Sequence, residues 1–440
     1  MQRDRHTRRG FLQRSAGLLA FAEGGGSWAV QSPASKERPF DLRPYRGEAL
    51  CPITCVTPAD GFYVHTYYDV CPFSPSQRYL AVTRVPFQDR LARLGDTADV
   101  CVIDLEQRTI KTVYTTKSWG FQTGANLHWG AADRHLYTND VVGNTAVCVR
   151  LDLEADSATA FAGPGYDVAP DESCAIGFPL ELLEITQPGY GAPPEDPDNP
   201  PQLPPGASRD QGLWRTDLGT NQRTLLLSLA HLAARIPEPP PRQGGTFYLW
   251  HSKFNRQGTR IMQVLRCLFP DRWGGRNPMV FTLKPDGSDV HLTPSFPLWG
   301  HGGGHPNWHP DGEHLLRNLR PDGTTVRLCK IAFDGSHYEV LSQTIEGGGH
   351  PTIEPRERYI ITDANERRDG EDCVRIRLID LVAQQDHTVC TMPTIRERDG
   401  HTVLRVDGHP AWSRDYRKVL FQATPDGARQ LFLADLSDVV

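Results

Sequence analysis

Four histidines occupy one position of a motif that recurs along this chain. The motif is clearest in HPNWHPDG, where Trp308 is an apolar anchor and a histidine stands three residues before it. Four consecutive copies carry histidine at this position: His251, His305, His350 and His409. Because only 16 of the 440 residues are histidines, chance does not readily produce this column. Converging imidazoles bind a first-row transition metal, or one acts as a general base while others bind an anionic substrate.

The sequence around the column bears on whether its role is functional or structural. Three of the four histidines stand in a Gly-His-Pro sequence, and glycines 302–304 and 347–349 precede two of them. Glycine lets backbone segments approach closely. The alternative is a structural role, in which each histidine caps a strand end by hydrogen bonding within its own repeat. The glycine-flanked His-Pro pairs favour a functional site.

Further residues are candidates for the same site. His301 lies four residues before His305 and is a possible extra ligand or base. His65, in GFYVHTYYDV, stands ahead of the first repeat beside Tyr67, and we expect both to reach the same face. The chain near His251 also carries four arginines: Arg215, Arg266, Arg272 and Arg276. Guanidinium groups bind carboxylates through two parallel hydrogen bonds, although a single arginine is more often a solvated surface charge.

The elements that must position these side chains are β-strands in repeated hairpins. Seven stretches combine an apolar anchor, a polar turn and a strand, and they begin at Phe73, Trp129, Val168, Phe254, Trp308, Ile353 and Trp412. Each is followed by a second hairpin such as VCVIDLEQRTIKTVY, except that the last, LFLADL, stops after one strand. Two hairpins make a four-stranded blade. The sequence therefore predicts an all-β, seven-bladed β-propeller of four-stranded antiparallel blades over residues 38–440, closed by a strand from within residues 40–70.

One interval between repeats is longer than the others. It separates Val168 from Phe254 by 86 residues, whereas the other intervals are 39 to 59 residues long. The excess is rich in proline and lies at about residues 188–210 and 236–245. Proline cannot donate to a sheet ladder, so this insertion is expected to be a surface loop or a lid, with a disordered insertion as the alternative.

Composition excludes several classes of protein. The net charge of −6 with interspersed signs gives no indication of a nucleic-acid partner. No apolar run approaches the ~20 residues that span a bilayer. The ten cysteines contain no CxxC pair, which excludes zinc ribbons and thioredoxin-like sites, and Cys51–Cys55 is one candidate disulfide. The chain has no G-x-S-x-G, H-E-x-x-H, P-loop or dinucleotide motif.

The N-terminus resembles a twin-arginine export signal. Arg8 and Arg9 precede Phe11, and a short apolar run ends in Ala20-Phe21-Ala22, an A-x-A cleavage option. A second option is Ser27-Trp28-Ala29. We therefore expect residues 1–30 to be a signal peptide and the protein to be periplasmic or secreted. A disordered basic tail is the alternative.

The repeat and the histidine column together resemble the oligogalacturonate lyase group of polysaccharide lyases, over roughly residues 60 to 436. The stretches WHSKFNRQGTRIMQV, HPNWHPDG and VFTLKPDGSDVHLT carry the resemblance. It implies a divalent metal on the propeller axis, typically manganese, with zinc or calcium as alternatives. It places His305 at a metal-ligand position, His251 at a catalytic histidine and Arg215 at a catalytic arginine. The chain departs from the family at Arg266 and Cys267, where a metal-binding histidine is expected, and no clear glutamine ligand is found.

The chemistry implied by the resemblance is β-elimination at a uronic acid in an oligosaccharide or polysaccharide. We assign His251, Arg215 and His65 to catalysis, His305, His350, His409 and His301 to the metal, and Arg266, Arg272, Arg276 and Tyr67 to the substrate. Ulvan and rhamnose–glucuronate linkages are alternative substrates. A metal-dependent hydrolase or isomerase is a further alternative, as is a non-catalytic periplasmic TolB-like binding propeller, which has no need of a histidine column. The sequence does not indicate an oligomeric state.

Overall fold

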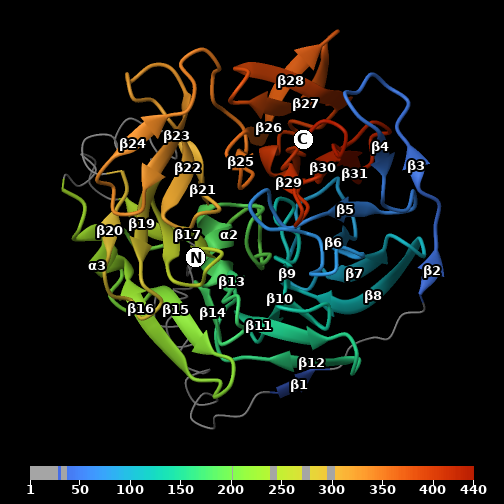
Figure 1. The fold of residues 1–440 in the computed structure, drawn as a ribbon. Helices are drawn as coiled ribbons and strands as arrows, with labels where there is room; N and C mark the ends of the chain where they lie inside the picture. The colour runs from blue at the N-terminus through green and yellow to red at the C-terminus, as the bar shows by residue number, and fades with distance from the viewer. Residues whose placement is uncertain (1–27, 31–36, 201, 238–244, 270–277, 295–302) are drawn as a thin grey trace, which may run out of the picture.

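The computed structural model describes residues 28–30, 37–200, 202–237, 245–269, 278–294 and 303–440. These residues form seven antiparallel sheets arranged as the blades of a ring (Figure 1). In each blade, successive strands run outward from the centre of the ring to its rim, for example from β9 to β12 (Figure 1). The predicted all-β, seven-bladed propeller is confirmed.

The first four blades follow the chain in order. The first contains β5 (Phe62–Val64), β6 (Tyr79–Val85), β7 (Ala98–Asp104) and β8 (Thr109–Thr116). The second contains β9 (His128–Trp129), β10 (His135–Val142), β11 (Thr145–Asp152) and β12 (Ser157–Ala160). The third contains β13 (Asp167–Val168), β14 (Cys174–Gly177), β15 (Gly212–Asp217) and β16 (Arg223–Ser228). The fourth contains β17 (Thr246–Phe254), β18 (Ile261–Leu268), β19 (Met279–Leu283) and β20 (His291–Leu292).

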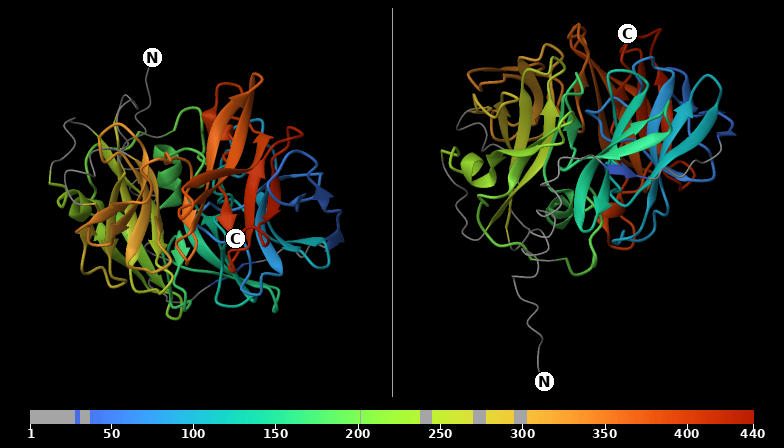
Figure 2. Two further views of the ribbon diagram at one scale, coloured as in Figure 1. Left: turned by 45° about the horizontal axis from the view of Figure 1, so that its top comes forward. Right: turned by 90° about the horizontal axis from the view of Figure 1, so that it is seen from below.

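The last three blades complete the ring, and Figure 2 views the blades from two further directions. The fifth contains β21 (Gly304–Trp308), β22 (His314–Leu319), β23 (Arg327–Ala332) and β24 (Tyr338–Val340). The sixth contains β25 (Thr352–Ile353), β26 (Tyr359–Arg368), β27 (Glu371–Asp380) and β28 (Gln385–Pro393). The seventh contains β29 (Ala411–Trp412), β30 (Lys418–Ala423) and β31 (Gln430–Asp435), joined by β4 (Ile53–Cys55) and β3 (Arg43–Pro44).

The N-terminal strands close the ring and extend three of its blades. In the seventh blade β4 pairs with β31, and Thr54 lies opposite Leu433, which confirms the predicted closing strand. β3 adds a fifth strand to this blade, and β2 (Arg38–Pro39) adds one to the first blade. β1 (Trp28–Val30) pairs with β12 of the second blade, although it falls within the segment expected to be a signal peptide.

Tryptophan anchors tie neighbouring blades together. The indole N–H of Trp308 donates to the backbone oxygen of Lys253 in the preceding blade, at 2.9 Å. Trp129 and Trp412 make the same kind of bond to Pro72 and Thr352. All three tryptophans are largely buried, where an indole N–H needs a partner. The anchor of the repeat is thus the residue that joins one blade to the next.

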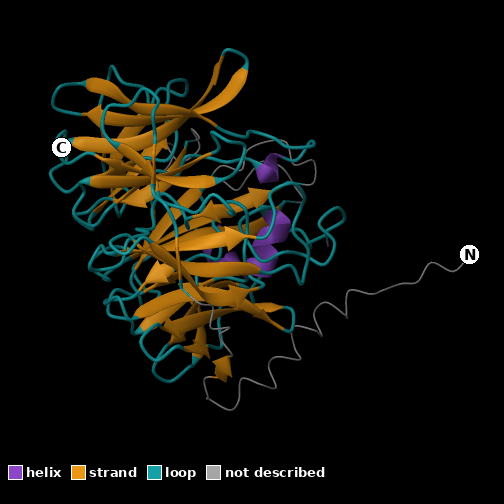
Figure 3. Cartoon of the chain, turned by 90° about the vertical axis from the view of Figure 1, so that its right-hand side faces the viewer, coloured by secondary structure: helices purple, strands orange, loops and turns teal. Residues whose placement is uncertain are grey.

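The two α-helices of the described chain, α2 (Leu180–Thr186) and α3 (Leu229–Ala233), lie on the same side of the strands (Figure 3). A 3₁₀ turn, η2 (Thr402–Leu404), precedes the seventh blade. Residues 189–193 of the proline-rich insertion are buried, whereas Glu195 and Asp196 are exposed. Only part of the insertion is therefore a surface loop.

The candidate disulfide between Cys51 and Cys55 is absent, because both cysteines are free thiols. Among the described helices, none is both long and apolar enough to cross a membrane.

Candidate active site

Three column histidines lie at or just before the start of their innermost strand, whereas His251 is the sixth residue of β17. The backbone conformation of the column is unusual. His251, His305 and His409 have φ angles of 53°, 51° and 44°, and Asn126, at the same position of the second blade, has 54°. β17 and β21 each change register at their histidine. A non-glycine residue in this left-handed region costs about 1–2 kcal/mol and concentrates at functional sites. The repeat therefore encodes a strained turn at the inner end of the blade.

The structure brings the column rings together around Tyr67. The ring centroid of His350 lies 4.1 Å from that of His305 and 4.3 Å from that of His409. The Tyr67 ring lies 4.4 Å from His409, 5.6 Å from His350 and 5.1 Å from His251. Tyr67 is itself 2% exposed. It thus separates His251 from the group formed by the other three.

His65 also belongs to this group. Its ring lies 6.4 Å from that of His409, and the side chain is buried. Burial lowers the pKa of His65 to about 4. His65 is therefore uncharged at neutral pH.

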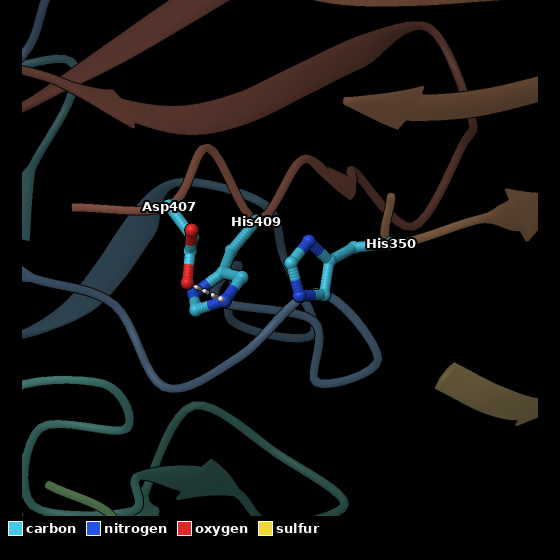
Figure 4. Close-up of side chains that lie close together, drawn as sticks. All are labelled: His350, Asp407 and His409. Carbon is cyan, nitrogen blue, oxygen red and sulfur yellow. Dashed lines mark ion pairs between the residues drawn. The ribbon is translucent and has the colours of Figure 1, made fainter. Parts of the chain in front are cut away.

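His350, His409 and Asp407 form the part of the column best suited to a metal ion (Figure 4). One ligand atom from each residue lies within 4.8 Å of the others. The Nε2 atom of His409 is buried without a hydrogen-bond partner and lies 3.9 Å from Asp407 Oδ2. An unpartnered buried imidazole nitrogen facing a carboxylate fits a divalent metal such as manganese or zinc. His305 stands beside His350 as a further donor.

Burial keeps most of the column uncharged. It lowers the pKa values of His251 and His409 well below the usual value, and it lowers the pKa of His305 to about 3. Neutral imidazoles have the free lone pairs that a metal or a proton requires. In His350, burial opposes the charged form, but the nearby carboxylate of Asp363 holds the pKa above its usual value.

Asp363 orients two column histidines at once. Its Oδ1 atom accepts hydrogen bonds from the backbone N–H and the Nδ1 atom of His350, both at 2.9 Å. Its Oδ2 atom accepts the backbone N–H of His409 at 3.1 Å. A carboxylate bound to Nδ1 directs the opposite nitrogen, Nε2, toward a metal. Asp363 was not predicted from the sequence.

His251 has a separate environment suited to a base. Its Nδ1 atom lies 3.0 Å from the hydroxyl of Tyr166, and its Nε2 atom is buried without a hydrogen-bond partner. Burial, followed by the positive charges of Lys253 and Arg266, lowers its pKa. A neutral His251 whose Nδ1–H is donated to Tyr166 has a free lone pair on Nε2. Such a nitrogen can remove a proton.

Two arginines are close enough for their positive charges to lower the pKa values of column histidines, Arg266 that of His251 and Arg405 that of His409. Arg266, on β18, donates to Gln187 at 3.1 Å, and its guanidinium lies 5.1 Å from the centre of the Trp250 ring. Arg405 donates to Asp407 at 2.7 Å and to the hydroxyl of Tyr190 at 2.8 Å.

Tyr190 brings the proline-rich insertion to the site. Its ring lies 6.2 Å from Tyr67 and 4.1 Å from Trp250. The buried part of the insertion therefore packs against the column.

Not every predicted site residue reaches the column. Arg215 lies on β15, the third strand of its blade, where it pairs with Asp217 at 3.7 Å. The third strand stands away from the axis, so Arg215 is not brought to the histidines. Arg272, Arg276 and His301 fall outside the described residues.

A second column, made of polar residues, was not predicted from the sequence. It lies in the second strand of most blades and consists of Thr83, Asn139, Gln263, Asn318, Asp363 and Gln422. Its members hydrogen-bond at or beside the column position of their own or the next blade, as Gln263 does to the backbone oxygen of His251 at 3.1 Å. The signal was a polar residue closing each apolar strand, as in YIITD and VLFQ. Asp407 had a weaker signal, two residues before His409.

Comparison with known proteins agrees with this fold. An oligogalacturonate lyase from Vibrio parahaemolyticus matches with a TM-score of 0.66 and 14% identity, covering 92% of this chain and 98% of that one. An oligogalacturonate lyase in complex with manganese matches with a TM-score of 0.63 and 15% identity, covering 91% and 97%. TolB from Acinetobacter baumannii gives a TM-score of 0.36 at 12% identity, covering 76% and 64%. No protein-family model and no curated protein matches the chain. The chain therefore has the seven-bladed propeller fold of the oligogalacturonate lyases.

Proposed function

We propose that this protein is an exported polysaccharide lyase that cleaves uronic-acid-containing oligosaccharides by metal-assisted β-elimination. The observation that carries the proposal is the buried cluster of His350, Asp407 and His409, with an unpartnered Nε2 on His409. The cluster occurs in a fold shared with oligogalacturonate lyases, one of which was solved with manganese. The unpartnered Nε2 of the buried, neutral His409 faces the Asp407 carboxylate, and a divalent cation would satisfy it.

In the proposed site, His350, His409 and Asp407 would hold the metal, with His305 as an additional ligand. A divalent cation supplies positive charge next to the uronate carboxylate, which makes the neighbouring C–H more acidic. Arg266 is the arginine we assign to the substrate carboxylate in place of Arg215, because its charge acts on His251. An arginine paired with that carboxylate stabilises the negative charge that develops when the proton leaves.

His251 is the residue we assign as base. Its Nε2 atom takes the C5 proton of the uronate, the electron pair forms the C4–C5 double bond, and the glycosidic oxygen leaves from C4. The imidazolium formed on His251 keeps its Nδ1 hydrogen bond to Tyr166. The product carries an unsaturated uronate, which absorbs ultraviolet light.

Ultraviolet absorbance provides the test of this proposal. The purified full chain is incubated with pectic, ulvan and rhamnoglucuronan oligosaccharides, with added Mn²⁺ or with chelator. We expect absorbance to rise on one substrate class and to be lost with chelator. If folded, manganese-loaded protein gives no rise on any substrate, the lyase proposal is wrong. Activity that survives complete metal removal would instead exclude the metal from the reaction.

Export is proposed on the N-terminal sequence alone. Cleavage after Ala22 would leave β1 in the mature chain, whereas cleavage after Ala29 would remove most of it. Mass spectrometry of protein recovered from the periplasm or medium of the producing cells measures the mature N-terminus. A full-length chain confined to the cytoplasm would contradict export.

A further inference from the structure

A polar cavity lies at the opposite end of the innermost strands from the histidine column. β17 passes the column at His251 and reaches the cavity at its last residue, Phe254, and β21 leads from His305 to its last residue, Trp308, in the same way. The cavity has a volume of about 320 Å³, and none of the column histidines lines it. Tyr68 lines the cavity and lies between the two regions, since its ring is also 5.1 Å from that of His350. We call this space the rear cavity.

Several buried polar atoms in the rear cavity have no partner. Both carboxylate oxygens of Asp69, the Nε2 atom of His128 and the hydroxyl of Thr352 lack hydrogen bonds, and all three residues line the cavity. The Asp69 side chain is 0% exposed. Burying a carboxylate without hydrogen bonds is costly, so atoms of this kind are normally satisfied by a ligand or by water. Their gathering in one cavity indicates a binding site.

The rear cavity is lined by charges of both signs, with Lys253, Arg256 and Arg414 beside Asp69 and Asp167. Lys253 Nζ lies 3.6 Å from Asp69 Oδ1, and His128 Nδ1 lies 3.3 Å from Asp167 Oδ1. Asp167 also accepts the backbone N–H of Phe254 at 2.7 Å. Arg414 already donates to the backbone oxygens of Phe73 and Ser74, and Arg256 donates to the hydroxyl of Tyr416. The buried atoms left without a partner are mainly acceptors, with the Lys253 ammonium beside them. This pattern suits a neutral ligand with several hydroxyl groups.

The walls of the rear cavity add apolar surface. Trp129, Trp308 and Trp412 line it, and their indole N–H groups already donate to backbone oxygens. They therefore offer carbon surface to a ligand. Indole carbon beside a carboxylate and an ammonium is a combination that holds a pyranose ring. The sugar packs its C–H face on the aromatic ring and donates its hydroxyls to the carboxylate.

We propose that the rear cavity binds a single neutral hexose unit and is a carbohydrate site separate from the histidine column. Its volume is at the lower end of ligand pockets, which span roughly 300–1,000 Å³, so it fits one sugar ring rather than a chain. A uronate is disfavoured at the position where the sugar hydroxyls would donate to Asp69, because its carboxylate would face the unpartnered oxygens of that residue. The inference does not depend on the lyase proposal, since no column histidine lines the cavity, although Asp69 Oδ2 lies 4.0 Å from Nδ1 of His251.

Saturation-transfer NMR and titration with D-galactose, D-glucose and D-mannose test this site on the full chain. We expect saturable binding of at least one of them, unchanged when the protein is made metal-free with chelator. D-galacturonate should bind about tenfold more weakly, as one unfavourable charge contact implies. Binding that disappears with the metal, or a preference for D-galacturonate, would overturn the proposal, as would no binding of any of the three hexoses.

Variants locate the binding. Asp69→Asn should weaken hexose binding about tenfold or more, since a charged hydrogen bond is lost. Asn307→Phe, at a position that lines the rear cavity, should abolish binding by filling the space. The Asn307 variant still tests the site if the Asp69 variant does not fold. The control is Asp171→Asn, an exposed carboxylate of the same region, which should bind as the wild type. Unchanged affinity in a folded Asn307→Phe protein would place any sugar elsewhere.

Discussion

The hydrogen bonds of each histidine decide which ring nitrogen it offers. Asp363 occupies Nδ1 of His350, and Tyr166 occupies Nδ1 of His251. In both rings Nε2 is left for chemistry. His409 likewise has an unpartnered Nε2. Neighbouring side chains therefore orient the imidazoles of the column. The spacing of the histidines in the sequence does not identify these neighbours.

Replacing the proposed base separates catalysis from metal binding. His251→Gln removes the basic nitrogen, so the elimination rate should fall about 10²–10⁴-fold, as is typical for loss of a general base. Bound manganese should stay at the wild-type level, because His251 lies outside the cluster of His350, Asp407 and His409. The measurements are steady-state kinetics and elemental analysis, with His387→Gln as control. Near-normal turnover in the His251 variant would remove His251 from the mechanism.

The buried His65 should make the metal-free protein sensitive to acid. Its pKa is about 4 in the fold, against about 6.5 in an unfolded chain. Below pH 6.5 the unfolded state therefore binds a proton that the folded state does not, and stability falls as pH drops from about 6.5 to about 4. His65→Gln should reduce this slope by at most about 1.4 kcal/mol per pH unit. Urea denaturation of both proteins at several pH values measures it, and parallel pH profiles would contradict the assignment.

At the scale of elements, a residue of the second strand hydrogen-bonds the column histidine of the same blade in the fourth, sixth and seventh blades. Asp363, on β26, holds His350 of its own blade and the backbone of His409 in the next. Asp363→Asn should therefore weaken Mn²⁺ binding about 10–100-fold, the usual effect of losing such a supporting carboxylate. Calorimetric titration of the metal-free protein measures this affinity. Asp369→Asn, in the exposed turn after β26, is the control, and equal affinities in both variants would show that Asp363 does not orient the site.

The sequence could predict those features that are repeated or periodic. Seven anchors and their hairpins specified the propeller, and the spacing of His305, His350 and His409 placed their rings together. Arg215 was assigned from the short sequence around it. Whether it reaches the histidines depends on the distance of its strand from the propeller axis, and it lies on a third strand. Asp407 lies in the connection between the sixth and seventh blades, and Tyr190 lies in the insertion between β14 and β15 of the third blade. No repeat determines the paths of these segments. Tertiary packing alone brings them to the axis.

At the scale of the whole molecule, the ring is held shut by noncovalent pairing between the two ends of the chain. β4 enters the seventh blade between β31 and β3, with Thr54 opposite Leu433 on one side and Pro44 on the other. Closure of this kind removes the open edges that a linear array of blades would expose. The cluster of His350, Asp407 and His409 depends on it, because His409 lies just before β29 of the blade that β4 completes.

Disrupting β4 should therefore loosen the ring and the site together. Thr54→Pro removes a backbone donor from a central strand and should cost about 3 kcal/mol of unfolding free energy. Arg38→Pro, in the outer strand β2, should cost much less, because β2 pairs on one side only. Thermal denaturation and hydrogen exchange of the two variants measure the difference. Exchange should rise in the first and seventh blades of the Thr54 variant before the third and fourth. If both variants are equally stable, and exchange is uniform around the ring, β4 is not the closure on which the fold depends.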